Sequence, residues 1–544
     1  MSLGGFDAAV VVVYAIAIFA LAQYVSRTRR GEAKDSEDYF LASRSLPWWA
    51  IGASLIAANI SAEQIVGMSG SGYQIGLAIA SYEWMAALTL LIVGKFFLPI
   101  FLRNRIYTMP QFLAERYGQN VRILMAVFWL ALYVFVNLTS IIWLGSIAVT
   151  RVAGVDQDVA MIGLAAFALA YQLRGGLKAV ALTDIVQVTL LVAGGLTVTG
   201  LTLHRLGEGR GVLAGFGRLT SELPGHFDMI LSPANPFYKD LPGISVLIGG
   251  MWIANLSYWG FNQYIIQRAL AAKDLEEAQK GVVFAAYLKL IMPVIIVLPG
   301  IAAVLIEPGL ARPDEAYPSM MRLLPTGMLG LVFAALCAAI VASTASKINS
   351  VATIFTLDLY ARFKPAADAA VPDGDVAEPA ASPEASPMQA ARERELVRVG
   401  RMAAIVATLL AIATARPLLG RFDQGFQYIQ EFTGFITPGI VVIFLLGLFW
   451  KRASEAGAIA AAVASGLLSL AFWQFWPSLP FMDRMALVFL ASLALAVLLS
   501  LAFPAVAGQN RIVTGDVDYR TTAGFNMAGL GVILILIALY AAWW

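Results

Sequence analysis

The 544-residue chain is poor in the groups that usually build metal or catalytic sites. It has one cysteine, Cys337, and two histidines, His204 and His226. A single thiol excludes a disulfide scaffold and a cysteine-based metal site, and the histidines do not form a metal-binding pair. No nucleophile–base pair or phosphate-binding loop stands at a recognisable spacing, so we do not expect an enzyme.

Charge is also scarce. Charged residues make up 13% of the chain and the formal net charge is +2, which is too small to suggest a nucleic-acid partner. Hydrophobic residues make up 59%, and the mean hydropathy is +0.76. This composition lies outside the soluble range and predicts an integral membrane protein.

Apolar segments near twenty residues long predict about fourteen transmembrane helices. Their expected limits are 6–25, 47–72, 78–102, 122–150, 157–173, 177–203, 242–267, 281–306, 326–360, 397–415, 424–450, 454–474, 484–504 and 525–544. Basic residues gather in the 26–46 connection and are absent from the 68–78 connection. The positive-inside rule therefore predicts that both termini lie outside. We expect a multi-pass protein of a bacterial cytoplasmic (inner) membrane.

Two segments lack a membrane pattern. The outer loop at 204–241 contains Gly, Pro and aromatic residues, enough for a short packed lid. The inner stretch 364–395 is rich in Ala, Pro, Asp and Glu, and this composition predicts a disordered linker.

The spans group as one, five, five and three. This predicts an extra N-terminal helix and inner loop (1–46), a first five-helix repeat (47–203), the outer loop, a second five-helix repeat (242–450) and three C-terminal helices (451–544). Each repeat begins with a polar interruption, Ala58-Asn59-Ile60-Ser61 or Ala254-Asn255-Leu256-Ser257. Because five is odd, the second repeat enters from the opposite side, as in inverted repeats whose broken helices frame a transport site. The predicted fold is an all-α polytopic membrane protein with a five-plus-five inverted-repeat core and discontinuous first helices.

Two lysines lie deep within predicted spans, where a charge costs roughly 2.5–3.5 kcal/mol. Lys289 is too far from either surface to extend easily to it, and we expect a functional role. For Lys347 we expect a structural pair with a nearby acid.

Several long motifs resemble one known family. They are Glu37-Asp38-Tyr39-Phe40-Leu41-Ala42, Ser45-Leu46-Pro47-Trp48-Trp49, Ala57-Ala58-Asn59-Ile60-Ser61-Ala62-Glu63-Gln64, Gly67-Met68-Ser69-Gly70, Tyr171 with Gly175-Gly176-Leu177, and Thr183-Asp184-Ile185-Val186-Gln187. This set resembles the solute:sodium symporter family over nearly the whole chain apart from the inner linker. The run from Trp259 to Arg268 is similar to the sodium/glucose cotransporter branch.

The resemblance implies sodium-coupled import of a neutral monosaccharide of the galactose or glucose class by alternating access. A polyol in a dry pocket needs hydrogen-bond donors and acceptors that replace water. The positions matching the family's sugar contacts are Asn59, Gln64, Glu83, Asn255, Lys289 and Gln430. Those resembling its gates are Tyr258 with Trp259 on the inner side, and Met68, Tyr82 and Phe426 on the outer side.

The resemblance also implies a sodium site. The matching ligands are the carbonyls of Ala57, Ile60 and Ala339 and the side chain of Ser343, oxygen ligands of the kind a hard cation prefers. Asp184 resembles an acid on the ion's exit route. The chain departs from the family at Ala342, which stands where a second hydroxyl is usual, with Thr344 nearby as a replacement.

Two departures touch the sugar side: Ala86 replaces a serine and Ser257 replaces a tyrosine. The loss of one hydrogen bond changes affinity by about 0.5–1.5 kcal/mol, which alters preference among sugars before substrate class. Alternatives are a symporter of the same fold for myo-inositol, an amino acid or a carboxylate, a proton-coupled sugar carrier, and a non-transporting sugar sensor. We expect a monomer in the lipid bilayer.

Overall fold

The computed structural model describes residues 3–26, 46–106, 108–174, 177–363, 387–505, 510–515 and 517–544. Within these ranges the chain is helical, and the one β contact is an isolated bridge between Leu46 and Ala272. The all-α class predicted from the sequence is confirmed.

Each predicted span contains at least one helix. Up to residue 206 the helices are α1 (Gly5–Ser26), α3 (Trp48–Asn59), η2 (Glu63–Met68), α4 (Ser69–Gln74), η3 (Leu77–Ala80), α5 (Ser81–Ile92), η4 (Val93–Phe97), α6 (Leu98–Arg103), α7 (Met109–Tyr117), α8 (Gln119–Ala131), η5 (Leu132–Leu138), α9 (Thr139–Ala153), α10 (Gln157–Arg174) and α11 (Leu177–Leu206). From there to residue 321 they are α12 (Val212–Glu222), η6 (Pro224–His226), α13 (Ser245–Ile248), α14 (Gly250–Leu256), η7 (Ser257–Phe261), α15 (Gln263–Leu270), α16 (Leu275–Ile306), η8 (Pro313–Glu315) and α17 (Ala316–Met321). The remainder are α18 (Met328–Thr353), η9 (Ile354–Tyr360), α19 (Ala361–Phe363), α20 (Pro387–Leu419), α21 (Gly425–Thr433), α22 (Thr437–Phe449), α23 (Glu455–Phe475), α24 (Phe481–Ala502) and α25 (Ala523–Ala542).

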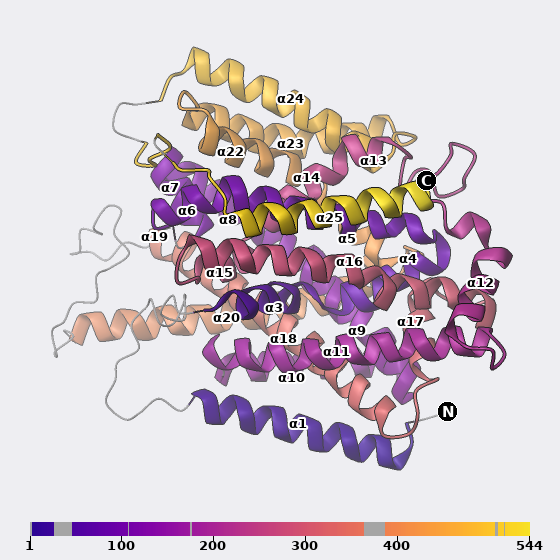
Figure 1. The fold of residues 1–544 in the computed structure, drawn as a ribbon. Helices are drawn as coiled ribbons and strands as arrows, with labels where there is room; N and C mark the ends of the chain where they lie inside the picture. The colour runs from indigo at the N-terminus through magenta and orange to yellow at the C-terminus, as the bar shows by residue number, and fades with distance from the viewer. Residues whose placement is uncertain are drawn as a thin grey trace.

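Among the described residues, nine helices are long and apolar enough to cross a membrane, or up to eleven when each of two bent pairs is one span. The multi-pass character is therefore clear, while the count of fourteen stays a prediction. The long helices lie side by side, with α1 at one edge and α24 at the other, and both termini lie at the end that carries α12 (Figure 1). The long α16 lies inside the bundle and packs against α3, α4 and α5.

The first interruption lies where the sequence predicted it. Helix α3 ends at Asn59, and Ile60 adopts an extended conformation with φ −70° and ψ 111°. The chain then re-enters a helix through the π-helical η2, and the two halves are bent by 68°. A break of this kind frees backbone groups that are tolerated in a membrane only when protein or a cavity surrounds them.

The second interruption was placed too early. Residues 254–258 are helical: α14 continues without a break into the π-helical η7. The extended residue is Asn262, with φ −84° and ψ 120°, and α15 follows it. The polar residues Asn255 and Ser257 therefore do not mark the break itself: Asn255 lies in the last turn of α14, and Ser257 is the first residue of the π-helical η7.

The structure adds detail to one predicted span and to the two segments predicted to lie outside the membrane. The segment at 424–450 is a bent pair, α21 and α22, with 48° between them. In the stretch predicted as a disordered linker, 364–386 lies outside the described residues, but Pro387 onward already belongs to α20. In the outer loop, α12 and η6 give local helical structure to part of the predicted lid.

Candidate functional site

All six side chains expected to contact a solute line one internal cavity. They come from α3, η2, α5, α14, α16 and α21, and the residues are Asn59, Gln64, Glu83, Asn255, Lys289 and Gln430. Four of the five expected gate residues line it as well: Tyr82, Tyr258, Trp259 and Phe426. The cavity lies beside the first break, the extended residue Asn262 and the bend between α21 and α22.

Asn59 and Gln64 face each other across the first break. Gln64 Nε2 donates to Asn59 Oδ1 at 3.2 Å and to Glu83 Oε1 at 2.7 Å. Asn59 Nδ2 donates to the hydroxyl of Tyr258 at 3.1 Å. Among the described residues, the buried Gln64 Oε1 has no hydrogen-bond partner. An acceptor of this kind is costly to bury unless a ligand or water completes it.

A buried ion pair stands next to these amides. Lys289 Nζ lies 2.6 Å from Glu83 Oε2, and the two side chains are 1% and 3% exposed. The same ammonium donates to Asn59 Oδ1 and lies 4.9 Å from the ring centre of Trp259. Its charge is therefore balanced by one carboxylate and one aromatic face inside the protein.

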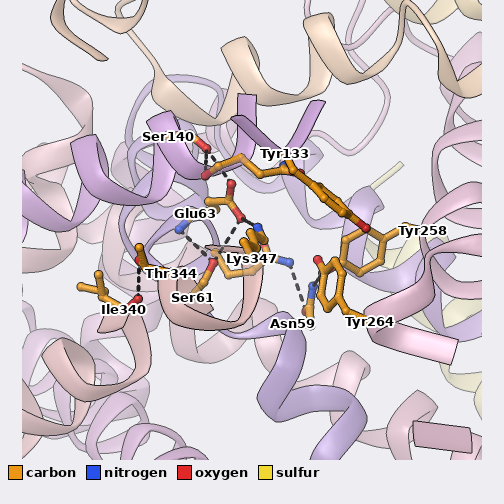
Figure 2. A network of polar contacts seen from close by, with 12 residues as sticks. Asn59, Ser61, Glu63, Tyr133, Ser140, Tyr258, Tyr264, Ile340, Thr344 and Lys347 are labelled. Carbon is orange, nitrogen blue, oxygen red and sulfur yellow. Dashed lines mark hydrogen bonds and ion pairs between the residues drawn. The ribbon is translucent and has the colours of Figure 1, made fainter. Parts of the chain in front are cut away.

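The tyrosine expected at the inner gate belongs to a second group of aromatic side chains. Tyr264 donates its hydroxyl to that of Tyr258 at 2.8 Å, and the Tyr133 hydroxyl donates to Asn262 Oδ1 at 3.3 Å. Figure 2 shows Tyr133 and Tyr258 close together, with Tyr264 beside Asn59. Sequence reasoning missed Tyr133, Tyr264 and Asn262, all of which line the cavity.

Asn255 and Gln430 line the cavity but lie outside the hydrogen-bonded group of Asn59, Gln64, Glu83 and Lys289. Asn255 Nδ2 donates to the Met251 carbonyl of its own helix at 3.1 Å, so one of its donors is satisfied within α14. Gln430 lies on α21, just before the bend to α22, and lines the cavity.

Two of the three side chains expected at the outer gate pack against each other. The rings of Tyr82 and Phe426 meet edge to face with centroids 5.1 Å apart. Met68 is completely buried but does not line the cavity.

Asp314, in the connection between α16 and α17, bonds to the start of the helix that carries Phe426. Its Oδ2 atom accepts a hydrogen bond at 2.9 Å from the backbone N–H of Gly425, the first residue of the helix that carries Phe426. Burial raises the pKa of the Asp314 carboxyl to about 7, although the Gly425 N–H and the charge of Arg312 oppose the shift. Helix α21 thus begins beside a carboxyl whose pKa is raised by burial.

A second polar cluster, not predicted as a site, surrounds Glu63 at the start of η2 (Figure 2). Its carboxylate accepts from Ser140 Oγ at 2.6 Å, from Ser61 Oγ at 3.3 Å and from Lys347 Nζ at 3.1 Å. The expectation that Lys347 pairs with an acid is confirmed. The available signal was an acidic residue four positions after Asn59 in an apolar span.

The positions expected to hold sodium lie apart from the cavity lining. Ala57, Ile60, Ala339 and Ser343 are not among its lining residues. Thr344, the suggested replacement for the hydroxyl missing at Ala342, donates to the carbonyl of Ile340 at 2.7 Å. Asp184 falls within α11, but its side chain is outside the described part of the structure. The sodium ligand set therefore stays a prediction.

The charges around the cavity balance in two pairs, Glu83 with Lys289 and Glu63 with Lys347. Within the described ranges no group of three or more His, Cys, Asp or Glu side chains could hold a metal ion. The cavity therefore offers donors, acceptors and aromatic surfaces without an excess of charge. Such a lining suits an uncharged solute with several hydroxyl groups.

Comparisons with known proteins agree with this architecture. The model of the sodium:solute symporter family matches residues 39–371 and 384–465. The chain is 48% identical to the sodium/glucose cotransporter of Vibrio parahaemolyticus, over 99% of this chain and 98% of that protein. It is 33% identical to the sodium/myo-inositol cotransporter 2 of Sus scrofa, over 85% of this chain and 69% of that protein. A solved structure of a Na+-coupled sialic acid symporter has a TM-score of 0.74 at 20% identity, covering 92% of this chain and 99% of that one, and shows that the fold is shared.

Proposed function

Because this chain belongs to the sodium:solute symporter family, as its motifs predict, we propose that it imports a neutral monosaccharide of the glucose or galactose class. The family and the relatives are transporters, so the chain is not an enzyme. The co-transported ion is sodium. The sugar is the new element of the proposal.

One observation supports a sugar as the transported solute. The Asn59, Gln64, Glu83 and Lys289 side chains form a single buried hydrogen-bonded group that still contains an unpartnered acceptor, Gln64 Oε1. A polyol can donate to Gln64 and Glu83 and accept from Lys289, which replaces the water that each hydroxyl loses. A solute with one net charge would instead disturb an ion pair that is already balanced.

We infer an alternating-access cycle. Sodium binds near the carbonyls of Ala57, Ile60 and Ala339 and the hydroxyl of Ser343, and this stiffens the broken first helix. Because Asn59 and Gln64 flank that break, the stiffened helix presents them to the sugar. Sodium favours the sugar-binding state only through its differential affinity for the two states. One charge crossing 100 mV contributes roughly 2.3 kcal/mol to uptake.

In this cycle, one group of residues would close the cavity to the outside and another would close it to the inside. Tyr82 and Phe426, together with the buried Met68, would close the outer side. Tyr258 with Trp259 would cover the inner side. We place the protein in a bacterial inner membrane, with both termini outside, in agreement with their position at one end of the bundle (Figure 1).

A second candidate solute is myo-inositol. The sodium/myo-inositol cotransporter of Sus scrofa is similar over 85% of this chain. A cyclic polyol without a ring oxygen would use the same donors and acceptors. The departures at Ala86 and Ser257, both on the cavity wall, are positions where the preference between these solutes would be set.

The deciding experiment is uptake of radiolabelled glucose, galactose and myo-inositol into proteoliposomes, with an inward sodium gradient or an equal potassium gradient at fixed pH and voltage. We expect sodium-stimulated accumulation of one hexose and strongly reduced uptake in Gln64→Ala. Preference for myo-inositol would select the second candidate. Equal uptake with both cations would contradict sodium coupling, and binding without uptake would indicate a sensor.

A further inference from the structure

The cluster around Glu63 is a set of oxygen atoms gathered where the first helix breaks. It comprises both carboxylate oxygens of Glu63, the hydroxyl oxygens of Ser61 and Ser140, and the Asn137 carbonyl, which lies 3.0 Å from Ser140 Oγ. Ser61 and Ser140 are 3% and 0% exposed, so water does not fully solvate this group. A carboxylate, hydroxyls and a carbonyl are the ligands that a hard cation prefers.

In this conformation the positive charge beside those oxygens is the side-chain ammonium of Lys347. Lys347 reaches from α18, and its ammonium lies 3.1 Å from Glu63 Oε2, with the side chains 7% and 15% exposed. The ammonium has three N–H donors, but within the described residues Glu63 is its one hydrogen-bond acceptor, and Tyr264 supplies a ring face at 5.6 Å. Lys347 is therefore held mainly by charge and is less fully bonded than the buried Lys289.

The location connects this pair with solute and ion. Glu63 lines the cavity, so an ion there can reach its carboxylate. Ser343 precedes Lys347 by one helical turn on α18, so the two side chains share a helix face. Figure 2 shows Lys347 and Glu63 beside the break that begins after Asn59.

We propose that Glu63, Ser61 and Ser140 form a monovalent-cation site of their own and that Lys347 occupies it as a tethered cation. Sodium and the ammonium then compete for the same carboxylate. While Lys347 is in place, the first break is neutralised without an ion. When Lys347 is absent, sodium binds to Glu63 and the two hydroxyls. This site is distinct from the ligand set expected at Ala57, Ile60, Ala339 and Ser343, and it does not depend on which solute is transported.

The test measures sodium binding to the purified full-length chain in detergent. Thermal unfolding is followed in sodium chloride and in choline chloride at equal ionic strength, together with equilibrium binding of radiolabelled sodium. In Lys347→Met we expect an additional sodium-dependent rise in Tm of about 3 °C over the wild type, because the ion stabilises only the folded state. We also expect about one more sodium bound per chain.

Matched variants separate this site from a general effect of charge removal. Lys347→Arg keeps a tethered cation and should show the wild-type response. Glu63→Gln combined with Lys347→Met removes the carboxylate and should abolish the gain. Arg122→Met is the control for charge removal, because it breaks a different ion pair, that of Arg122 with Asp358 at 2.6 Å. Its Tm should show no additional dependence on sodium.

Lys347→Gln is the second route if Lys347→Met does not fold, because an amide can still donate to Glu63 without carrying charge. The same sodium-dependent gain is expected. The proposal is overturned if neither uncharged variant responds more strongly to sodium than the wild type. It is also overturned if the double variant keeps the gain.

Discussion

The ammonium of Lys289 and the carboxylate of Glu83 form an ion pair of 2.6 Å between α16 and α5, at a depth where both side chains are almost inaccessible to solvent. The pair is joined by Gln64, which donates to the other carboxylate oxygen of Glu83. In such surroundings neither charge is stable without the other. The pair thus fixes two helices and supplies a donor and an acceptor to the cavity.

Replacing one partner of this pair should destabilise the fold and abolish uptake. Lys289→Met leaves a buried carboxylate uncompensated, for which the expected loss is about 3–5 kcal/mol. The double variant Glu83→Gln/Lys289→Met should regain most of that stability but not the uptake, because the donor to the solute is missing. Thermal unfolding and proteoliposome uptake measure the two quantities. A double variant no more stable than Lys289→Met would contradict the pairing.

The hydroxyl and the ring of Tyr258 should have separable effects. Tyr258→Phe removes the acceptor of two hydrogen bonds, from Asn59 and from Tyr264, but keeps the ring. The bond to Asn59 holds a proposed solute contact, so its loss should raise the KM for solute roughly two- to tenfold, the equivalent of one hydrogen bond. Tyr258→Ala should also speed sodium-free efflux of preloaded solute several-fold, if the ring is the inner gate. Tyr133→Phe is the matched control, since its hydroxyl bonds to Asn262 instead. Identical efflux from the Ala and Phe variants would argue against gating by Tyr258.

The pH dependence of stability should show the titration of Asp314. The carboxyl pKa is raised from 3.8 to about 7 by burial, so the folded chain binds this proton more tightly than the unfolded chain does. Its contribution is therefore complete below about pH 3.8 and is lost as the pH rises through about 7. Between pH 6 and 8 the wild type should lose about 1.4 kcal/mol from this group.

Asp314→Asn should remove that part of the slope when Tm is measured across the same pH range. Asp240, whose pKa burial raises to about 6 with help from the charge of Glu431, acts in the same direction at lower pH, so part of the wild-type slope should persist. The exposed Asp228→Asn serves as a control that should leave the slope unchanged. A wild-type slope in Asp314→Asn would show that this carboxyl does not titrate near neutrality.

Arg116 should matter for stability and not for solute affinity. Its guanidinium, 1% exposed, donates to the carbonyls of Gly447, Trp450 and Ala453 at 3.0, 2.9 and 3.0 Å, where α22 ends. Arg116→Lys keeps the charge but cannot reproduce three bonds from one planar group. We expect a loss of about 3 kcal/mol, from two charged hydrogen bonds, with the KM for solute unaltered in the folded fraction. A changed KM with an unchanged Tm would show that Arg116 acts on solute binding and not on stability.

Much of the site could be predicted because its residue types are rare in their surroundings. Four polar residues lie in apolar spans, where burying a polar side chain is costly unless it has a function: Asn59, Gln64, Glu83 and Lys289. Some of the motifs around them also resemble one family. These four residues do lie together on one cavity wall. Their roles in binding sugar stay predictions, and so do the five-plus-five repeat and the sodium ligands.

The misplaced second break shows where such reasoning stops. The match between 58–61 and 254–257 suggested equivalent geometry, but the chain unwinds at Ile60 in one case and at Asn262 in the other. Sequence similarity of four residues does not specify whether a π-helical turn precedes the break. The bend between α21 and α22 was also missed, although Gly434 and Pro438 beside it are residue types that commonly end or kink a helix.

The sequence by itself determined the membrane class, the apolar segments, the first broken helix and the family, because hydropathy and long motifs are properties of local chain chemistry. Tertiary structure alone decided which carboxylate pairs with which lysine: Glu83 with Lys289 across 206 positions, and Glu63 with Lys347 across 284. The physical reason is that a charge buried in a bundle takes the partner that helix packing brings within about 3 Å, and that distance depends on the bends and crossings of helices far apart in the chain.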